Sequence, residues 1–421
     1  MKKNENFITV VDVGSSKVCC LIAERSQDNS QELEIKGIGL QRSDGIKNGS
    51  IVDMEKVERS IRQTVQTAEK MAKVTIENII VNFFESRYES RRFKTALNIN
   101  GGEIGDQDLK KIWHNCIKEN ITEDQKVLHT TPINYSVDGK SGISDPRGMY
   151  GKKLECMFHI VTTSQQIISN LKSCINRCHL EVGQIVLSPY ASGIACIKPD
   201  EKKLGVTCID IGGGTTSVAT FVNEKFVFAK TLPIGGENIT NDIASGLSTS
   251  ISDAERIKTT HGSVIPTNLD ENESIDVPLL VGDEEGSDIH QIPRSLLNGF
   301  IRPRLEEILE HVRDSLENSG IKKENYQFIV ATGGAIQMAG IRELISQFME
   351  NKQTRIATQP KRFKGEAEAT TGSSFATVKG LLEHARIESS KDDFRSYNFM
   401  MNKTNLAHKI ITWFKDNLNP L

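Results

Sequence analysis

The chain has 421 residues, of which 37% are hydrophobic, and its formal net charge at pH 7 is −3. This length and apolar content allow two or more domains with their own cores, and the balanced charge gives no electrostatic basis for binding nucleic acid. The eight cysteines form no CxxC pair or zinc-type array, so buried, reduced thiols and a cytosolic compartment are expected. We expect no signal peptide before the first strand, and no apolar run reaches the roughly 20 residues of a membrane span.

The first predicted element is a β-hairpin at 7–23, in which two apolar, β-branched runs flank a turn of small residues. The turn contains Gly14, Ser15, Ser16 and Lys17. Glycine leaves room for an anionic oxygen beside successive backbone N–H groups, the hydroxyls add donors, and lysine adds a point charge. The turn is therefore predicted to bind phosphate. Asp12, at the end of the first strand, suits a Mg²⁺ ion that keeps most of its waters.

The next elements indicate an α/β protein with an insertion. Apolar residues recur at helical spacing over 53–73, and 76–84 returns to an extended pattern. From 85 to 161 the pattern changes to a charged stretch, a helix near 106–119 and extended segments. We predict that 85–161 forms a small separate subdomain inserted into the first half.

A second hairpin at 205–222 repeats the first. At a constant offset of 198 residues, Thr9, Asp12 and Gly14 correspond to Thr207, Asp210 and Gly212. A single glycine-rich hairpin is more often only a turn, but two matched copies favour one nucleotide held between two related halves. Asp210 is then the second candidate for the magnesium site. The predicted phosphate contacts in this copy are Gly212, Gly213, Gly214, Thr215 and Thr216.

A third element follows a predicted strand at 328–330, where Gly333, Gly334 and Ala335 precede a helix expected to start near Met338. Paired glycines allow a nucleoside to lie against bare backbone, although an ordinary strand-to-helix turn would look the same. In this order and spacing, the motifs at 12–17, 210–216 and 332–336 resemble the phosphate-1, phosphate-2 and adenosine motifs of the actin, Hsp70 and sugar-kinase superfamily. Neither a Walker P-loop nor a GxGxxG pattern is present. The resemblance implies a duplicated, actin-like α/β fold of two lobes that binds ATP and Mg²⁺.

The inserted segment distinguishes among relatives of that superfamily. It contains PINYSVDG at 132–139 and Pro-Arg-Gly-Met at 146–149, and further matches surround the second hairpin at 188–192 and 235–258. From about residue 7 to 386, and again at the tail, the chain resembles the FtsA family of bacterial cell-division proteins, whose unique subdomain lies at this place. The organisation expected is a first lobe at 1–84 and 162–197, an insertion at 85–161, a second lobe at 198–239 and 301–386, a subdomain 2B at 240–300, a linker at 387–404 and a tail helix at 405–421.

The resemblance also assigns residues of the second half. It places Glu255 and Lys258 near the ribose and adenine, and Glu237 at the start of a helix beside the nucleotide. Without it, Glu255 and Lys258 would equally suit an exposed helix face with i,i+3 spacing. It further implies that 2B binds the C-terminal peptide of the tubulin-like protein FtsZ. Arginine side chains can pair with an acidic peptide. The predicted contacts are Arg294, Ser295, Arg302 and Arg304, while the acidic segment 263–290 matches nothing in the family.

The tail is predicted to attach the protein to a membrane. Residues 387–404 lose periodicity and read as a tether, whereas 405–421 form an amphipathic helix of the kind that lies in a membrane interface. The alternative is a terminal helix docked on the protein's own core. One such tail gives only reversible attachment, but many tails on one polymer would hold firmly. The predicted membrane-facing residues are Leu406, Ile410, Ile411, Trp413, Phe414 and Leu418.

The resemblance therefore implies an actin-like, ATP-binding division protein that polymerises on the cytoplasmic face of the inner membrane at the septum. There it would tether FtsZ filaments and meet other division proteins. Where hydrolases of the superfamily often place an acid, this chain has Ser188-Pro189, so ATP hydrolysis is expected to be slow or absent. The alternatives are a pilus-assembly or shape-determining actin relative and, with less support, a metabolite kinase.

Overall fold

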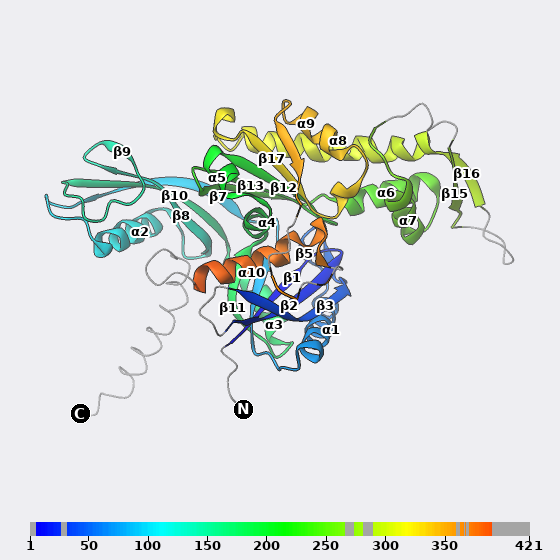
Figure 1. Cartoon of the computed structure of the whole chain (residues 1–421), viewed down its shortest axis with the longest axis horizontal. Coiled ribbons are helices and arrows are strands. Elements are labelled where there is room, and N and C mark those ends of the chain that lie inside the picture. The colour runs from blue at the N-terminus through cyan, green and yellow to red at the C-terminus, as the bar shows by residue number, and fades with distance from the viewer. Residues whose placement is uncertain are drawn as a thin grey trace. The chain divides into compact units, whose positions relative to one another are not determined.

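The computed structural model describes residues 6–26, 32–265, 273–280, 289–358, 363–365, 367 and 370–389 (Figure 1). The chain forms two compact units, of which the first contains Met1–Arg87 and Ser169–His384 and the second is built mainly from Tyr88–Ile168. The predicted amphipathic helix, with all six of its membrane-facing residues, lies outside the described residues. Within the described residues, no helix combines the length and apolarity needed to cross a bilayer.

The first unit begins with a five-stranded sheet in the order β11-β6-β1-β2-β3. Antiparallel β1 (Phe7–Val13) and β2 (Lys17–Arg25) form the predicted hairpin, and β6 (Asn78–Phe83) runs parallel to β1. Helix α1 (Met54–Ala72) packs on β3 (Leu33–Arg42) so closely that a Cβ at Gly39 would lie 1.9 Å from the Thr64 carbonyl oxygen. Asp53 caps this helix, because its side chain accepts from two backbone N–H groups of the first turn.

A second five-stranded sheet, β14-β13-β12-β17-β18, repeats this plan. Antiparallel β12 (Val206–Ile211) and β13 (Thr216–Val222) form the hairpin, and β17 (Phe328–Thr332) runs parallel to β12 as β6 does to β1. Both hairpin turns close with the same backbone bond, from Gly14 N–H to Lys17 O (3.0 Å) and from Gly212 N–H to Thr215 O (2.9 Å). The predicted duplication is therefore present in the backbone itself.

Helices complete the first unit. Helix α4 (Ser188–Cys196) crosses α10 (Ala376–Ser389), where a Cβ at Gly380 would lie 1.9 Å from the Ala191 carbonyl oxygen. Helix α10 continues through Ser389, so 387–389 extend the helix instead of beginning the predicted tether. The other elements of this part of the chain are β4 (Ile46–Lys47), β5 (Ser50–Ile51), α3 (Gln165–Asn176), β11 (Glu181–Leu187), α5 (Pro199–Leu204), β14 (Lys225–Leu232), α6 (Gly236–Leu247), α7 (Ile251–His261), β15 (Ser274–Pro278), β16 (Ile289–Pro293), α8 (Arg294–Glu317), α9 (Ile341–Phe348) and β18 (Gln353–Ile356).

The segment after β17 differs from its prediction. A short 3-10 turn, η2 (Ala335–Gln337), follows the paired glycines, and α9 begins only at Ile341. Gly340 has φ of +83° and separates the two pieces. A positive φ breaks a right-handed helix, so the expected helix start near Met338 was three residues early.

The second unit is a four-stranded sheet with one helix on it. Its strands lie in the order β7-β10-β8-β9, and α2 (Asp106–Asn120) supplies Leu109, Ile112 and Trp113 to a core shared with Phe158 and Ile160. The charged stretch after residue 85 is strand β7, whose mostly exposed residues hide its extended pattern. The strands are β7 (Glu89–Asn98), β8 (Gln125–Val137), β9 (Lys140–Ile143) and β10 (Lys153–Ser164).

The crossing of α4 and α10 can be tested with one methyl group. Gly380→Ala is expected to lower the free energy of unfolding by roughly 1–3 kcal/mol, because the added Cβ would collide with a backbone carbonyl that cannot rotate away. Gly299→Ala in α8, where an added Cβ meets nothing within 4 Å, should be neutral or stabilise by up to about 1 kcal/mol. Urea unfolding of both variants checks this, and equal effects would show that the close crossing is not present in solution.

Candidate functional site

Two cavities meet where the hairpin turns of the first unit approach each other. The smaller has a volume of about 120 Å³ and the larger about 740 Å³. Both are lined by Ser15 and Ser16 from the first turn and by Gly212 and Gly213 from the second, so they form one continuous site with two ends. Gly334 of the third motif also lines both. All three motifs predicted from the sequence therefore converge on one place.

The turns meet so closely that glycine is required. A Cβ on Gly213 would lie 2.8 Å from Glu237 Oε1 and 2.9 Å from the Ser16 Cβ, and one on Gly214 would lie 2.5 Å from Ser15 Oγ. Contacts under 3.0 Å are not tolerated by a real Cβ. The second turn thus presents bare backbone to the first, as expected for a loop that lets anionic oxygens reach N–H groups.

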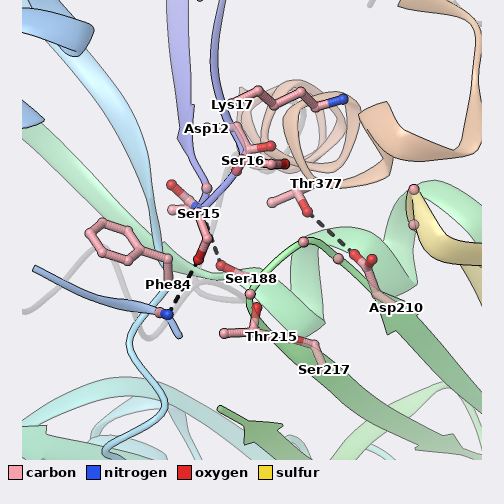
Figure 2. Close-up of a pocket in the computed structure, with 18 of the residues that line it drawn as sticks. Asp12, Ser15, Ser16, Lys17, Phe84, Ser188, Asp210, Thr215, Ser217 and Thr377 are labelled. Carbon is pink, nitrogen blue, oxygen red and sulfur yellow. Dashed lines mark hydrogen bonds between the residues drawn. The ribbon is translucent and has the colours of Figure 1, made fainter. Parts of the chain in front are cut away.

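The smaller cavity holds both predicted metal-binding carboxylates. Figure 2 shows Asp12 and Lys17 on one side and Asp210 and Thr377 on the other. Burial raises the pKa of Asp12 to about 7, with Lys17 opposing and Asp210 reinforcing the shift. Burial also raises the pKa of Asp210, although the Ser192 hydroxyl donates to that carboxylate at 2.5 Å and lowers it. Burial disfavours the ionised form of both carboxylates. A hydrated divalent cation bound beside them would offset this effect.

Most residues predicted to contact the nucleoside line the larger cavity: Glu237, Glu255, Lys258, Gly334, Ala335 and Met338. Gly333, predicted with them, lines the smaller cavity instead. Glu237 is the second residue of α6, next to the second turn, and its pKa is raised by burial and by the nearby Glu255.

Lys258 is buried and plays a supporting part. Its Nζ donates to Gly236 O at 3.1 Å, to Thr240 Oγ1 at 2.7 Å and to Glu255 Oε2 at 2.5 Å. An ammonium has three N–H donors, so these contacts engage all of them. Lys258 therefore holds Glu255 and the start of α6 in place, and the exposed-face alternative is wrong for Lys258 but describes the half-exposed Glu255.

The structure does not bring Thr216 to the site. Thr216 is the first residue of β13, is fully buried and donates its hydroxyl to Ile234 O at 2.9 Å. Alternate side chains of a strand point to opposite faces, so Thr215 lines the smaller cavity and Thr216 does not. The predicted phosphate contact at Thr216 is corrected on this ground.

The four predicted partner-binding residues lie on α8 and line neither cavity. Arg304 forms a bidentate ion pair with Asp242 at 2.6 and 2.9 Å. Arg302 pairs with Glu306 at 2.8 Å, and Arg294 donates to Glu273 at 2.8 Å. Each guanidinium already has a carboxylate partner in its own chain, so an acidic peptide would have to compete for it. Ser295 is exposed at the start of the helix.

Several site residues were not predicted. Arg42 and Ser43 line the larger cavity, and among the described residues the buried Ser43 hydroxyl has no hydrogen-bond partner. Ser374, in the 3-10 turn just before α10, and Thr377, in the first turn of α10, line the smaller one. A run of glycine, serine and threonine before a helix, at 372–377, was the available signal. Asn82 also lines it, but its amide is occupied by Val13 N–H (2.7 Å), Val13 O (3.1 Å) and Ser188 Oγ (3.1 Å).

Comparison with solved structures defines the class of protein. The chain matches the PilM-PilN type IV pilus biogenesis complex with a TM-score of 0.60 at 14% identity, covering 90% of this chain and 98% of that one. It matches MreB5 of Spiroplasma citri bound to ADP with a TM-score of 0.54 at 13% identity, covering 92% and 99%. The fold is the predicted duplicated, actin-like α/β fold.

Sequence comparison then gives the family. A family model described as cell division protein FtsA matches residues 207–380, and one for the SHS2 domain inserted in FtsA matches 86–162. FtsA of Rhizobium meliloti is 37% identical over 91% of this chain and 88% of that protein; FtsA of Bacillus subtilis is 31% identical over 94% and 88%. FtsA of Escherichia coli is 28% identical over 91% of each. The chain belongs to the FtsA family of bacterial cell-division proteins, which sets aside the pilus-assembly, shape-determining and metabolite-kinase alternatives.

The buried charge at Asp12 predicts a pH-dependent stability. The folded-state pKa near 7 lies above the unfolded value of 3.8, so the folded state holds an extra proton between these values and loses stability as pH rises towards 7. Asp12→Asn removes the penalty. Without nucleotide or divalent cation, its stability relative to the wild type is expected to rise by roughly 2–3 kcal/mol between pH 5 and 7.5.

Asp138→Asn is the matched control. Backbone N–H groups of Lys152 and Lys153 lower the pKa of the exposed Asp138, so its contribution is complete above pH 4 and its loss should be the same at pH 5 and pH 7.5. Urea unfolding across this range measures both variants. If the difference in free energy of unfolding between Asp12→Asn and the wild type does not change with pH, Asp12 is already ionised or paired.

Proposed function

We propose that the chain binds one ATP with Mg²⁺ in the cleft between its two hairpin turns. The observation that carries the proposal is the meeting of two glycine turns, one from each sheet, around a cavity lined by Asp12 and Asp210. Among the actin-like structures that share this fold, MreB5 of Spiroplasma citri has been solved with ADP and with AMPPNP.

The two ends of the cleft suggest the direction of the ligand. The smaller end is lined by turn glycines, hydroxyls, Lys17 and both aspartates, which suit phosphates and a hydrated cation. The larger end has bare backbone at Gly334 and Ala335, the Met338 side chain and the acceptor Glu255, which suit an adenine and a ribose. A bound Mg²⁺ would offset the charge of the phosphates, held through its waters by Asp12 and Asp210.

ATP hydrolysis is proposed to be slow. In the superfamily position for a catalytic acid, Ser188 donates its hydroxyl to Phe83 O at 2.7 Å. The neighbouring Asn82 amide is bonded on both sides. Among the described residues that line the smaller cavity, Asp12 and Asp210 are the only carboxylates, and these are assigned to the metal. The described lining of this cavity therefore offers no further carboxylate to act as a base towards an attacking water.

Gly213→Asp tests the nucleotide site. The new side chain would occupy the space between Ser16 and Glu237 and add a negative charge beside the phosphates, so ATP affinity is expected to fall at least about 10-fold. Gly105→Asp is the matched control, because Gly105 caps α2 in the second unit and an added Cβ there meets nothing within 4 Å. Titration with a fluorescent ATP analogue measures both, and equal affinities in the two variants would contradict the site. Asp210→Ala should weaken binding mainly when Mg²⁺ is present.

For the cell, we propose that the protein polymerises on the cytoplasmic face of the inner membrane at the division septum, with 405–421 as its peripheral anchor. Its role there is to tether FtsZ filaments through their C-terminal peptide and to meet other division proteins. The hairpin β15–β16 and the first turn of α8 expose Leu280 (66%), Ile289 (60%) and Leu296 (44%). Because the nearby arginines are already paired, we assign the main part of peptide docking to these apolar side chains.

Tethering is tested by one reconstitution. A labelled FtsZ C-terminal peptide should co-sediment with anionic liposomes only when the full chain is present. Deleting 405–421 should abolish co-sedimentation, because the apolar helix face is lost, while peptide binding in solution, measured by fluorescence anisotropy, stays unchanged. Undiminished co-sedimentation with the truncated chain would contradict the anchor, and no anisotropy change with the full chain would contradict the partner.

A further inference from the structure

Lys17 has an unusual partner for a lysine in a polar cleft. It is the first residue of β2, lines only the smaller cavity, and its Nζ lies 3.6 Å from the centroid of the Phe375 ring. A cation at this distance over an aromatic face is attracted by the ring's negative quadrupole. The lysine predicted as a phosphate ligand is therefore held by a residue 358 positions away in the sequence.

The ring is fixed by the third nucleotide motif. Phe375 is 7% exposed and ends the short 3-10 turn η4 (Ser373–Phe375), directly before α10. Ser373 Oγ donates to Gly333 O at 2.8 Å, and Ser373 O accepts from Thr332 Oγ1 at 3.1 Å and from Gly333 N–H at 3.3 Å. The turn that carries the ring is thus tied to the glycines at the end of β17, so the ring has a defined place relative to the cleft.

An aromatic partner leaves the donors of the lysine available. Among the described residues, no oxygen accepts a hydrogen bond from Lys17 Nζ, whereas Lys258 in the same cleft uses all three of its N–H groups on protein acceptors. A carboxylate partner would have neutralised the charge and consumed donors, but a ring does neither. Burial lowers the pKa of Lys17 although the charges of Asp12 and Asp210 act to raise it, so these two carboxylates attract the ammonium without accepting a hydrogen bond from it.

We propose that Phe375 is a positioning residue, which presents the Lys17 ammonium to the terminal phosphate of the bound nucleotide and so sets the preference for a triphosphate over shorter nucleotides. This inference rests on the proposed nucleotide site and its direction. Lys17, Asp210 and Thr377 line only the smaller cavity, at the far end from the nucleoside residues. A monophosphate, whose single phosphate lies nearest the nucleoside, would not reach that end.

Phe375→Leu removes the π face and keeps an apolar side chain. We expect the affinity for ATP to fall about 10-fold, as for a largely desolvated cation–π contact, while the affinity for AMP stays within about twofold. Phe375→Tyr retains a π face and should restore the wild-type ATP-to-AMP ratio. Competition against a fluorescent nucleotide, with thermal unfolding to confirm the fold of each variant, gives these ratios. A wild-type ratio in folded Phe375→Leu would overturn the proposal.

Lys17→Met completes a double-mutant cycle. If Phe375 acts through Lys17, adding Phe375→Leu to Lys17→Met should change the ATP-to-AMP ratio no further. An undiminished additional loss would show a merely structural role and overturn the proposal.

Should the leucine variant not fold, NMR of the wild type labelled with ¹³C-lysine decides instead. The ring must shift the Lys17 ε-methylene protons upfield, and an unshifted signal overturns the contact. A wild type that binds no nucleotide would overturn the proposed function and this inference with it, whereas normal binding with an unchanged ratio overturns this inference alone.

Discussion

The close approach of two glycine turns is the constraint on which the rest of the first unit depends. At Gly213 and Gly214 there is no space for a Cβ against Ser15, Ser16 and Glu237. Helix α6 also fixes the second turn, because the Gly212 and Gly213 carbonyls accept hydrogen bonds from the first two backbone N–H groups of α6, at 2.9 and 2.8 Å. Helix α6 therefore starts where the turn fixes it, and Glu237 and the buried Lys258 network follow from that start.

Because the two turns lie so close together, charged side chains are buried between them, where the folded chain alone does not stabilise their charges. Asp12 and Asp210 line one small cavity and both have raised pKa values because they are buried. Lys17 lowers the pKa of both, yet it is itself poorly solvated and stacked on a ring. Such an arrangement disfavours the charged forms of these groups, and the proposed cation and polyanion together would offset that cost. Stability given up at a binding site is a recognised sign of function, and both hairpins repeat the buried aspartate, as Asp12 and Asp210.

The sequence was most informative where the signal is local. Each hairpin, its glycine turn and its aspartate lie within about 20 consecutive residues, so alternation and turn chemistry suffice to predict them. The 198-residue repeat then linked two local patterns into one site. The inserted unit was also recognisable, because its change of pattern is local, although the exposed edge strand β7 was not, since its side chains are mostly polar.

The remaining features depend on contacts that a single sequence does not reveal. The resemblance places Lys258 near the nucleoside, and it lines the larger cavity, but its acceptors Gly236 and Thr240 come from another helix and cannot be read from the sequence. Thr216 looked like a second hydroxyl donor beside Thr215. It is already the first residue of β13, so its side chain points to the opposite face of the strand. Phe375 contacts Lys17 from the turn η4, and Thr377 reaches the site from the start of α10 by a 3.5 Å bond to Asp210, 167 positions earlier. Tertiary placement, not local propensity, decides these roles.

We propose that both hairpin turns enclose one ATP, with both aspartates directed at its cation. A crystal structure of the protein grown with ATP and Mg²⁺ tests it most directly. We expect a triphosphate between Gly14 and Gly213, a hydrated Mg²⁺ facing both Asp12 and Asp210, and adenine beside Gly334. Nucleotide density elsewhere, or a fully loaded crystal with the two aspartates facing away from the metal, would contradict it.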